Sequence, residues 1–349
     1  MLGDRRRKSE QPRTKKGMSS SSFSFFSGMD FGLRSTASSS SSSAPLEKGL
    51  ILRYDDVVAW LKFVLEYDAG LTALWDEKII KNGWTDYQLY IMTFWIILAF
   101  YIVCCIPYCL LDLFKLKQTD KERLQPGTYN SFSLMTKGAV LVLVVFFTTI
   151  LPLQMCSGPF FEIAGINGTK PFPKVWQALL QLAIFFVVED YGNYWIHRWL
   201  HTPWAYKHIH YMHHEFDTPT ALAASYAHPI EVLVLGSPTF LGPAIVGCHV
   251  SVCWAWFVLR ELEALETHSG YDFWWSPTKL IPFYGGSEYH DYHHWVGGKS
   301  RGNFASIFTY CDYIYGTDKG YRAEKRRLNG ERLQHSVGSE TLNKIEKNE

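Results

Sequence analysis

The chain has 349 residues, of which 47% are hydrophobic and only 19% are charged. Its 34 basic and 33 acidic side chains give a formal net charge of +1, which excludes a general basic field for binding nucleic acid. Seven cysteines in this length exclude a disulfide-dense secreted scaffold. The mean hydropathy of −0.07 averages polar ends with a long apolar middle, so the chain is not a fully disordered protein.

The first 48 residues are predicted to be a disordered tail. Residues 1–17 are rich in arginine and lysine, and residues 19–43 are rich in serine, so this segment cannot bury a core. A transit peptide is the alternative, but Asp4, Glu10 and Asp30 weaken its acid-poor signature. Apolar and charged residues then mix at helical spacing over residues 49–88, which predicts an amphipathic helix at the membrane interface.

Four apolar regions follow, and they predict membrane segments. A membrane span needs about 20 apolar residues. Residues 89–111 supply this length, and residues 138–155 nearly do. Residues 175–188 form a third, shorter region within the expected membrane part of residues 89–188. Residues 230–259 are long enough for a broken hairpin, with bends expected at Gly236, Pro238, Gly242, Pro243 and Gly247. We therefore expect an all-α integral membrane bundle with about four membrane segments.

Charge between the first two apolar regions predicts the orientation. Five basic residues lie there, and the positive-inside rule places them in the cytosol: Lys115, Lys117, Lys121, Arg123 and Lys137. Two more crossings return the chain to the same side, so the histidine-rich stretch that follows is expected to face the cytosol. The basic N-terminus conflicts with this orientation unless residues 49–88 also cross, and both arrangements stay open.

Eight of the 13 histidines fall into three clusters: His197 and His201; His210, His213 and His214; and His290, His293 and His294. Offsets of three and four residues place side chains on one face of a helix, where they can meet a metal. Eight imidazoles exceed the four ligands of a single zinc ion and suit two adjacent metals. Repetition of the same spacing argues against isolated structural histidines, because unpaired polar groups are costly near a bilayer.

Acidic and histidine residues near the clusters are candidate supports. Asp190 shares a helix face with His197 and His201, so we expect it to accept a ring N–H from a ligand histidine. The alternative is a helix-end residue that meets lipid headgroups. His228 precedes a proline and lies near Glu231, and it either approaches the metal or pairs with Glu231.

The three clusters, in this order and spacing, resemble the fatty-acid hydroxylase and sterol desaturase superfamily of membrane di-iron enzymes. Residues 227–231 (Ala-His-Pro-Ile-Glu), 266–272 (Glu-Thr-His-Ser-Gly-Tyr-Asp), 281–286 and 302–322 resemble the sterol 4α-methyl monooxygenases. Residues 296–300 and 309–313 are similar to the plant-type first branch of that family. The similarity covers about residues 50–322 and excludes the serine-rich tail.

The resemblance implies a cytosolic, histidine-rich helical cap that holds two irons. It implies a catalytic domain over residues 189–317, including the hairpin, and a charged tail over residues 318–349. His268 becomes the ninth expected ligand, and Asp272 is a ligand, a support or a surface residue; no catalytic residue separate from the metal ligands is expected. The implied reaction uses O2 to oxidise the 4α-methyl group of 4,4-dimethylsterols, such as 24-methylenecycloartanol, to alcohol, aldehyde and carboxylate.

The implied partners follow from what the sequence lacks. It contains no GxGxxG and no haem-binding His-Pro-Gly-Gly, so the resemblance implies electrons from NADH through cytochrome b5 and its reductase. It also implies a sterol C4 dehydrogenase that decarboxylates the acid, and residence in the endoplasmic reticulum membrane. The alternatives are another superfamily member (a sterol desaturase, fatty-acid hydroxylase or aldehyde-forming wax enzyme) and a histidine-rich metal transporter. Spans nearly bare of polar groups argue against a transporter.

Overall fold

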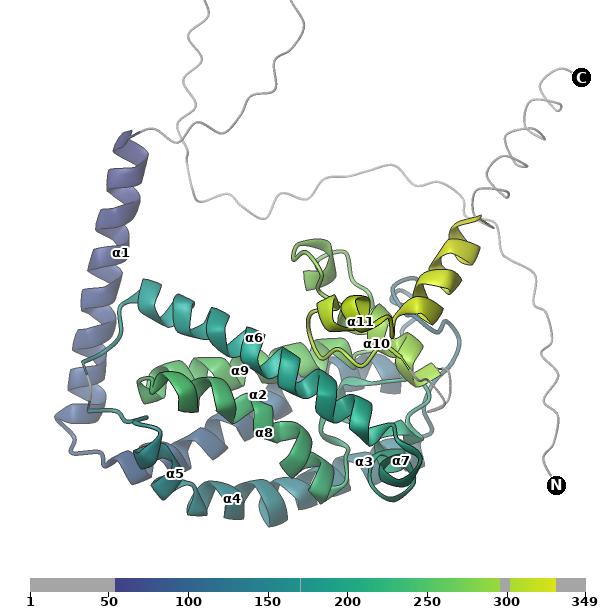
Figure 1. The fold of residues 1–349 in the computed structure, drawn as a ribbon, viewed down its shortest axis with the longest axis horizontal. Coiled ribbons are helices and arrows are strands. Elements are labelled where there is room, and N and C mark those ends of the chain that lie inside the picture. The colour runs from purple at the N-terminus through teal and green to yellow at the C-terminus, as the bar shows by residue number, and fades with distance from the viewer. Residues whose placement is uncertain (1–53, 170, 296–301, 331–349) are drawn as a thin grey trace, which may run out of the picture. The chain divides into compact units, whose positions relative to one another are not determined.

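The computed structural model describes residues 54–169, 171–295 and 302–330. The expected tail of residues 1–48 and the end of the C-terminal tail (331–349) lie outside this part of the chain. Within it, every regular element is helical, and the only β-type pairings are three isolated bridges. The all-α prediction is therefore confirmed (Figure 1).

The connections between the labelled α-helices range from a single residue to long segments that contain 3₁₀ turns. In chain order they are α1 (Tyr54–Trp75), α2 (Asp86–Phe114), α3 (Phe132–Val145), α4 (Leu151–Cys156), α5 (Gly158–Ile163), α6 (Val175–Leu200), α7 (Pro203–His208), α8 (Pro229–Val246), α9 (Val250–Thr267), α10 (Gly286–Trp295) and α11 (Tyr310–Tyr315). Two π-type turns are η1 (Asp76–Ile80) and η2 (Phe146–Ile150). Three 3₁₀ turns are η3 (His210–Glu215), η4 (Ala221–Ser225) and η5 (Pro277–Lys279).

Three helices are long and apolar enough to cross a membrane. They are α2, the continuous helix Phe132–Cys156 formed by α3, η2 and α4, and α8. Helix α2 begins at a capping box, in which the Thr85 side chain accepts the Gln88 backbone N–H. The third expected segment corresponds to the first half of the 26-residue α6. This helix continues through charged residues to Leu200 and is not one of the three candidate membrane spans. About four segments were expected, and the described residues supply three candidates.

The expected hairpin of residues 230–259 consists of two helices, α8 and α9. The chain breaks at Gly247, whose φ of 67° lies in the left-handed region that favours glycine. Pro238 and Pro243 lie inside α8 and do not end it. Gly242 lets α8 approach α6 closely, because a Cβ there would lie 2.7 Å from Cα of Phe185. The bend is thus at one of the five expected places.

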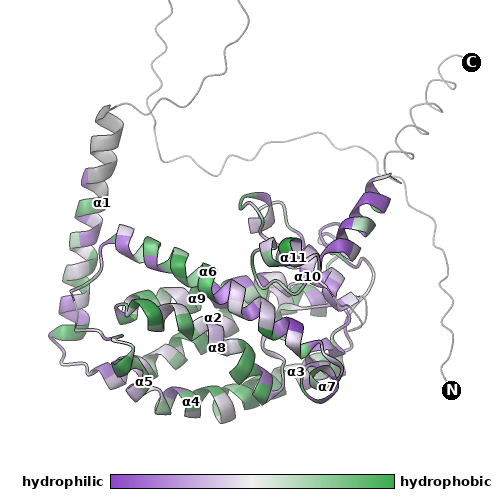
Figure 2. Cartoon of the chain, viewed as in Figure 1, coloured by the Kyte–Doolittle hydropathy of each residue, from purple (hydrophilic) through white to green (hydrophobic). Residues whose placement is uncertain are grey.

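Apolar and polar parts of the bundle separate along its length. Figure 2 shows hydrophobic residues over much of α4 and α8, and hydrophilic residues over the second half of α6 and around α10. Large buried aromatic side chains fill the core, including Phe185, Trp256, Phe94 and Tyr226. The histidine-bearing elements lie at the polar part.

Candidate metal centre

Four elements carry the nine predicted ligand histidines. His197 lies in the last turn of α6, and His201 caps the C-terminal end of that helix. His268 caps the C-terminal end of α9. The 3₁₀ turn η3 carries His210, His213 and His214, and helix α10 carries His290, His293 and His294.

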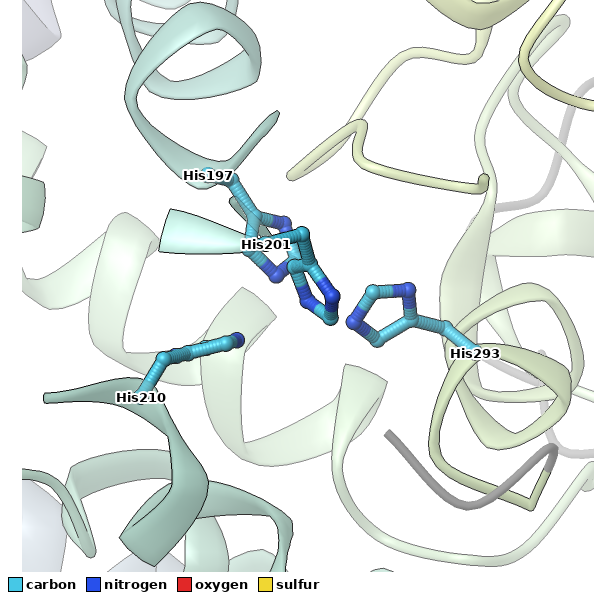
Figure 3. Close-up of side chains that lie close together, drawn as sticks. All are labelled: His197, His201, His210 and His293. Carbon is cyan, nitrogen blue, oxygen red and sulfur yellow. The ribbon is translucent and has the colours of Figure 1, made fainter. Parts of the chain in front are cut away.

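The histidines come together as two groups of four. In the first group, one ring nitrogen from each of His197, His201, His210 and His293 lies within 4.8 Å of the others. Figure 3 shows these four rings pointing toward one another from separate parts of the chain. The second group meets the same limit with His213, His268, His290 and His294. Two sets of four nitrogen donors match the expectation of two adjacent metal positions.

Two of the three sequence clusters divide between the groups. His210 belongs to the first group and His213 to the second, although the spacing predicted one shared face. In α10, His290 and His294 belong to the second group while His293 belongs to the first. Successive residues of an α-helix are rotated by about 100°, so the adjacent pair in α10 points in different directions. His197 and His201 stay together in the first group, whereas the other two clusters contribute to both groups.

His214 belongs to neither group of four. Its Nε2 lies 3.2 Å from Nε2 of His210, a member of the first group. Its ring centroid lies 4.4 Å from that of His294, a member of the second group. His214 therefore lies between the two groups, in contact with both.

Backbone carbonyls orient most of the rings through Nδ1. The Nδ1–carbonyl distances are 2.9 Å for His197 with Phe304, 3.2 Å for His213 with Tyr226, 2.8 Å for His268 with Ala264, 2.8 Å for His293 with Gly302 and 3.2 Å for His294 with Phe216. A carbonyl oxygen only accepts hydrogen bonds, so Nδ1 of each ring carries the proton. Nε2 of each ring then presents a lone pair to its group.

These lone pairs fit a metal ion. Nε2 of His213 and Nε2 of His268 lie 3.2 Å apart, and neither carries a proton that the other could accept. A bound cation turns this repulsive contact into two coordinate bonds. Burial also lowers the pKa of His268 and of His197 to about 4, so both rings are neutral at pH 7, as metal binding requires.

Glu231 orients one further ring. Its Oε1 accepts the Nδ1 proton of His210 at 2.8 Å, and both side chains are buried. A carboxylate in this position fixes the ring and makes it a stronger donor to a metal. The alternative of a His228–Glu231 pair is not observed. Nδ1 of His228 instead accepts the backbone N–H of Ile230 and caps the start of α8.

Asp190 and Asp272 have partners other than histidine. Oδ1 of Asp190 accepts the backbone N–H groups of Ile307 and Phe308, each at 2.9 Å. Asp190 thereby holds the segment whose Gly302 and Phe304 carbonyls orient ligand rings, instead of accepting a ring N–H itself. Oδ2 of Asp272 pairs with Nζ of Lys279 at 2.6 Å.

A cavity of about 260 Å³ lies beside both groups. Five of the histidines line it: His197, His210, His213, His268 and His290. Helix α9 contributes three charged side chains to its wall, which are Arg260, Glu261 and Glu263. Sequence reasoning missed them, because a run of alternating charged and apolar residues near a helix end is typical of a solvated surface.

Ion pairs hold part of this charged wall together. The guanidinium of Arg260 contacts Oε1 of Glu189 at 2.8 Å and Oγ of Ser306 at 2.9 Å. It also pairs with Glu263, three residues along α9. One arginine therefore neutralises two buried carboxylates beside the cavity.

A second, more apolar hollow of about 810 Å³ lies between α2 and α9. Its lining includes Tyr108, Phe186, Leu259, Phe273 and Trp275, and no histidine. Glu263 lines both this hollow and the cavity beside the histidines.

Comparisons with known proteins agree with this site. Residues 182–317 match the family model described as fatty acid hydroxylase. Methylsterol monooxygenase 1-2 of Arabidopsis thaliana is 47% identical over 79% of this chain and 93% of its own length. Methylsterol monooxygenase 1-1 of the same plant is 48% identical over 74% of this chain and 87% of its own length. The very-long-chain aldehyde decarbonylase GL1-10 of Oryza sativa subsp. japonica is 48% identical over 70% of this chain and 81% of its own length. No solved structure matches the chain.

Fold and site together define the class: a helical membrane protein with two four-histidine groups arranged to hold metal. The chain belongs to the fatty acid hydroxylase family, within the part of it that includes the methylsterol monooxygenases. The resemblance drawn from the histidine clusters is thereby confirmed.

Proposed function

We propose that the protein is a membrane di-iron monooxygenase that oxidises the 4α-methyl group of 4,4-dimethylsterols stepwise to alcohol, aldehyde and carboxylate. One observation carries the proposal: two buried four-histidine groups adjoin one cavity in a chain whose methylsterol monooxygenase relatives match it over most of its length. When bound, the two irons supply the activation of O2. The protein's own residues hold the rings, keep them neutral and shield them from water.

The proposed ligands are nine histidines: the eight of the three clusters and His268. Each group of four holds one metal, and His214, which contacts both groups, is an additional ligand. Imidazole suits iron, copper, nickel and zinc. Iron is favoured because the proposed reaction oxidises an unactivated methyl group with O2, which zinc, having no redox chemistry, cannot support.

The proposal extends to the electron donor, the membrane and the next enzyme. Electrons come from NADH through cytochrome b5 and its reductase, because the sequence has no nucleotide or haem motif of its own. The histidines face the cytosolic side of the endoplasmic reticulum membrane, where the basic loop after α2 is expected. A sterol C4 dehydrogenase consumes the carboxylic acid product.

A second candidate function is supported by relatives with a different printed name. The rice protein named as a very-long-chain aldehyde decarbonylase matches at an identity similar to those of the methylsterol monooxygenases. The two candidates differ in the substrate: a rigid, four-ring alcohol in one case and a linear aldehyde in the other. Substrate comparison therefore separates them.

Product analysis by mass spectrometry tests the proposal. Microsomes from yeast that lacks its own methyl oxidase, with this chain expressed, receive NADH, O2 and one of three substrates: a 4,4-dimethylsterol, a 4α-monomethylsterol or a long-chain aldehyde. We expect oxidised carbon-4 products from the dimethylsterol. Products from the monomethylsterol alone overturn the substrate branch, and conversion of the aldehyde alone overturns the function. The matched control is the His213→Ala chain, from which no product is expected.

A further inference from the structure

One carboxyl group in the wall of the cavity beside the histidines has no role assigned so far. Glu261 lies on α9 and lines the cavity. Its Oε1 is shielded from solvent and has no hydrogen-bond partner among the described residues. A buried acceptor without a partner is uncommon in a native protein and calls for an explanation, such as an absent ligand.

The other charged groups of the cavity wall are already engaged. Arg260 pairs with Glu189 and Glu263, and Thr267 donates to Glu263 at 2.7 Å. Glu231 also has one oxygen without a partner, but its other oxygen holds the ring of His210. Glu261 alone among these carboxylates makes neither an ion pair nor a contact with a histidine in the described structure.

The position of Glu261 suits a hydroxyl group next to a reacting carbon. Seven residues separate it from His268 on the same helix, which is about 10 Å along the axis. In a 4,4-dimethylsterol, the hydroxyl on carbon 3 and the methyl groups on carbon 4 are on neighbouring atoms. A hydroxyl bound at Glu261 therefore leaves the methyl group next to it, inside the cavity that five of the histidines also line.

The rest of the cavity wall is suited to an apolar ring system. Val145 and Ile150 of the Phe132–Cys156 helix line it, together with Val232 and Leu235 of α8. Both helices are candidate membrane spans, so this side of the cavity is formed by membrane-facing elements. These apolar side chains give a rigid ring system a surface to pack against, beside the polar groups that line the rest of the cavity.

We propose that Glu261 binds the carbon-3 hydroxyl of the sterol and so positions the carbon-4 methyl group beside the two histidine groups. This inference rests on the proposed function. Glu261 acts through the hydroxyl and is a positioning residue, and its effect is expected on substrate selection more than on the chemistry at the metals.

The state of the carboxyl agrees with this role. Burial raises the pKa of Glu261 to about 7, against the opposing effect of Arg260. Near neutral pH the group is therefore able to accept a hydrogen bond from a hydroxyl or to donate one to it.

Comparison of two substrates tests the inference. The first is the 4,4-dimethylsterol, and the second is its 3-deoxy analogue, which lacks the hydroxyl but adds no bulk. With the full-length wild-type protein in microsomes, we expect an apparent KM roughly 10- to 100-fold lower for the hydroxylated sterol, as for a hydrogen bond to a charged group. In Glu261→Met, the KM for the hydroxylated sterol should rise to that of the analogue, whose own KM should not change.

Controls separate this role from a structural one. Glu162→Met changes an exposed glutamate on α5 and should leave the ratio of the two KM values unchanged. Measurement of the iron content shows whether the Glu261→Met protein still has an intact metal centre. If Glu261→Met loses iron, Glu261→Gln is measured in its place. The glutamine keeps a hydrogen-bond acceptor without the charge, so the ratio of the two KM values should be smaller than in the wild-type protein.

Two results would overturn the inference while the proposed function stands. One is equal KM values for both sterols in the wild-type protein. The other is an undiminished preference for the hydroxylated sterol in an iron-loaded Glu261 variant. Failure of the proposed function is a different outcome, in which the wild-type protein oxidises no sterol.

Discussion

Six of the nine proposed ligand histidines are oriented by a hydrogen bond at Nδ1. Five rings donate this proton to a backbone carbonyl, and His210 donates it to Glu231. The free nitrogen, Nε2, is thereby directed into a group where only a cation satisfies it. The buried Asp190 acts one step farther away, by holding the backbone that supplies two of the carbonyls.

Loss of one ring should therefore remove the metal chemistry without unfolding the membrane part. In His213→Ala, we expect iron content to fall and sterol oxidation to drop by at least about 100-fold, since even residues that only support a ligand contribute 10- to 100-fold. Iron analysis and product yield measure the two effects. The matched control is His208→Ala, because His208 is exposed and its Nδ1 contacts only the Trp204 carbonyl. Full turnover in His213→Ala would contradict the ligand assignment.

Removal of the charge on Glu231 should weaken iron binding without abolishing it. In Glu231→Gln, the amide oxygen still accepts the Nδ1 proton of His210, but the negative charge is lost. We expect iron affinity to decrease by about 10-fold, the lower end of the range for such supports. Titration of the iron-loaded protein with a chelator measures this. The control is Glu288→Gln, which removes a carboxylate that pairs with Lys325 and contacts Tyr321; it should titrate like the wild type. A Glu231→Gln protein that also titrates like the wild type would show that the charge of Glu231 has no effect on iron binding.

At the scale of the elements, sequence periodicity predicted helices more reliably than it predicted which residues share a metal. The spacing of His290, His293 and His294 does lie on an α-helix, but residues 210–215 form a 3₁₀ turn between α7 and Phe216. The carbonyl partners of the rings come from backbone, which leaves no side-chain signal in the sequence.

Hydropathy predicted two spans well and a third poorly, for a physical reason. Helix α2 and the Phe132–Cys156 helix are apolar along their length, and both were expected. Helix α6 is apolar in its first half only, because its second half carries Glu189, Asp190 and His197. One helix thus connects the apolar part of the bundle to the metal centre.

The contact between α6 and α8 should be sensitive to a single methyl group. In Gly242→Ala, the new Cβ would lie 2.7 Å from the Phe185 backbone, so the helices must separate. Overpacking of this kind typically costs about 1–3 kcal/mol of unfolding free energy. Gly236→Ala is the matched control on the same helix, since no atom lies within 4 Å of its Cβ position. That change should raise stability by about 0.5–1 kcal/mol.

Thermal unfolding in detergent micelles measures both variants. The expected order of Tm is Gly236→Ala at or above the wild type, and Gly242→Ala below it. A Gly242→Ala protein as stable as the wild type would show that α6 and α8 are not tightly packed at this point.

For the whole molecule, the sequence determined the class and the histidine set, and the fold determined the pairing. Three clusters and His268 come from four separate elements, and the packing of α6, η3, α9 and α10 brings eight of the nine histidines together as two groups. The charged cavity wall formed by α9 could not be predicted from the sequence either, because the burial of Arg260 and Glu263 depends on Glu189 from another helix. Such long-range pairs carry no local pattern.

Because the groups join these elements, metal removal should weaken the whole fold, and more so in acid. In the iron-depleted protein, burial holds the pKa of His197 and His268 near 4, below the ordinary value of about 6.5 in the unfolded chain. Between these values the unfolded chain binds more protons than the folded one, so stability falls as the pH is lowered from about 6.5 to 4. A bound metal occupies the nitrogens and opposes this protonation.

The Tm of iron-loaded and chelated protein at about pH 7, 6 and 5 measures this effect. We expect the chelated form to be less stable at every pH, and the gap to widen by several degrees toward pH 5, at roughly 2–4 °C per kcal/mol. Asp190, whose pKa burial raises to about 7, changes stability with the opposite slope. It does so in both forms, so the difference between them reports on the histidines. A gap that stays constant with pH would mean that protons and metal do not compete for the same nitrogens, which would contradict the proposed ligand set.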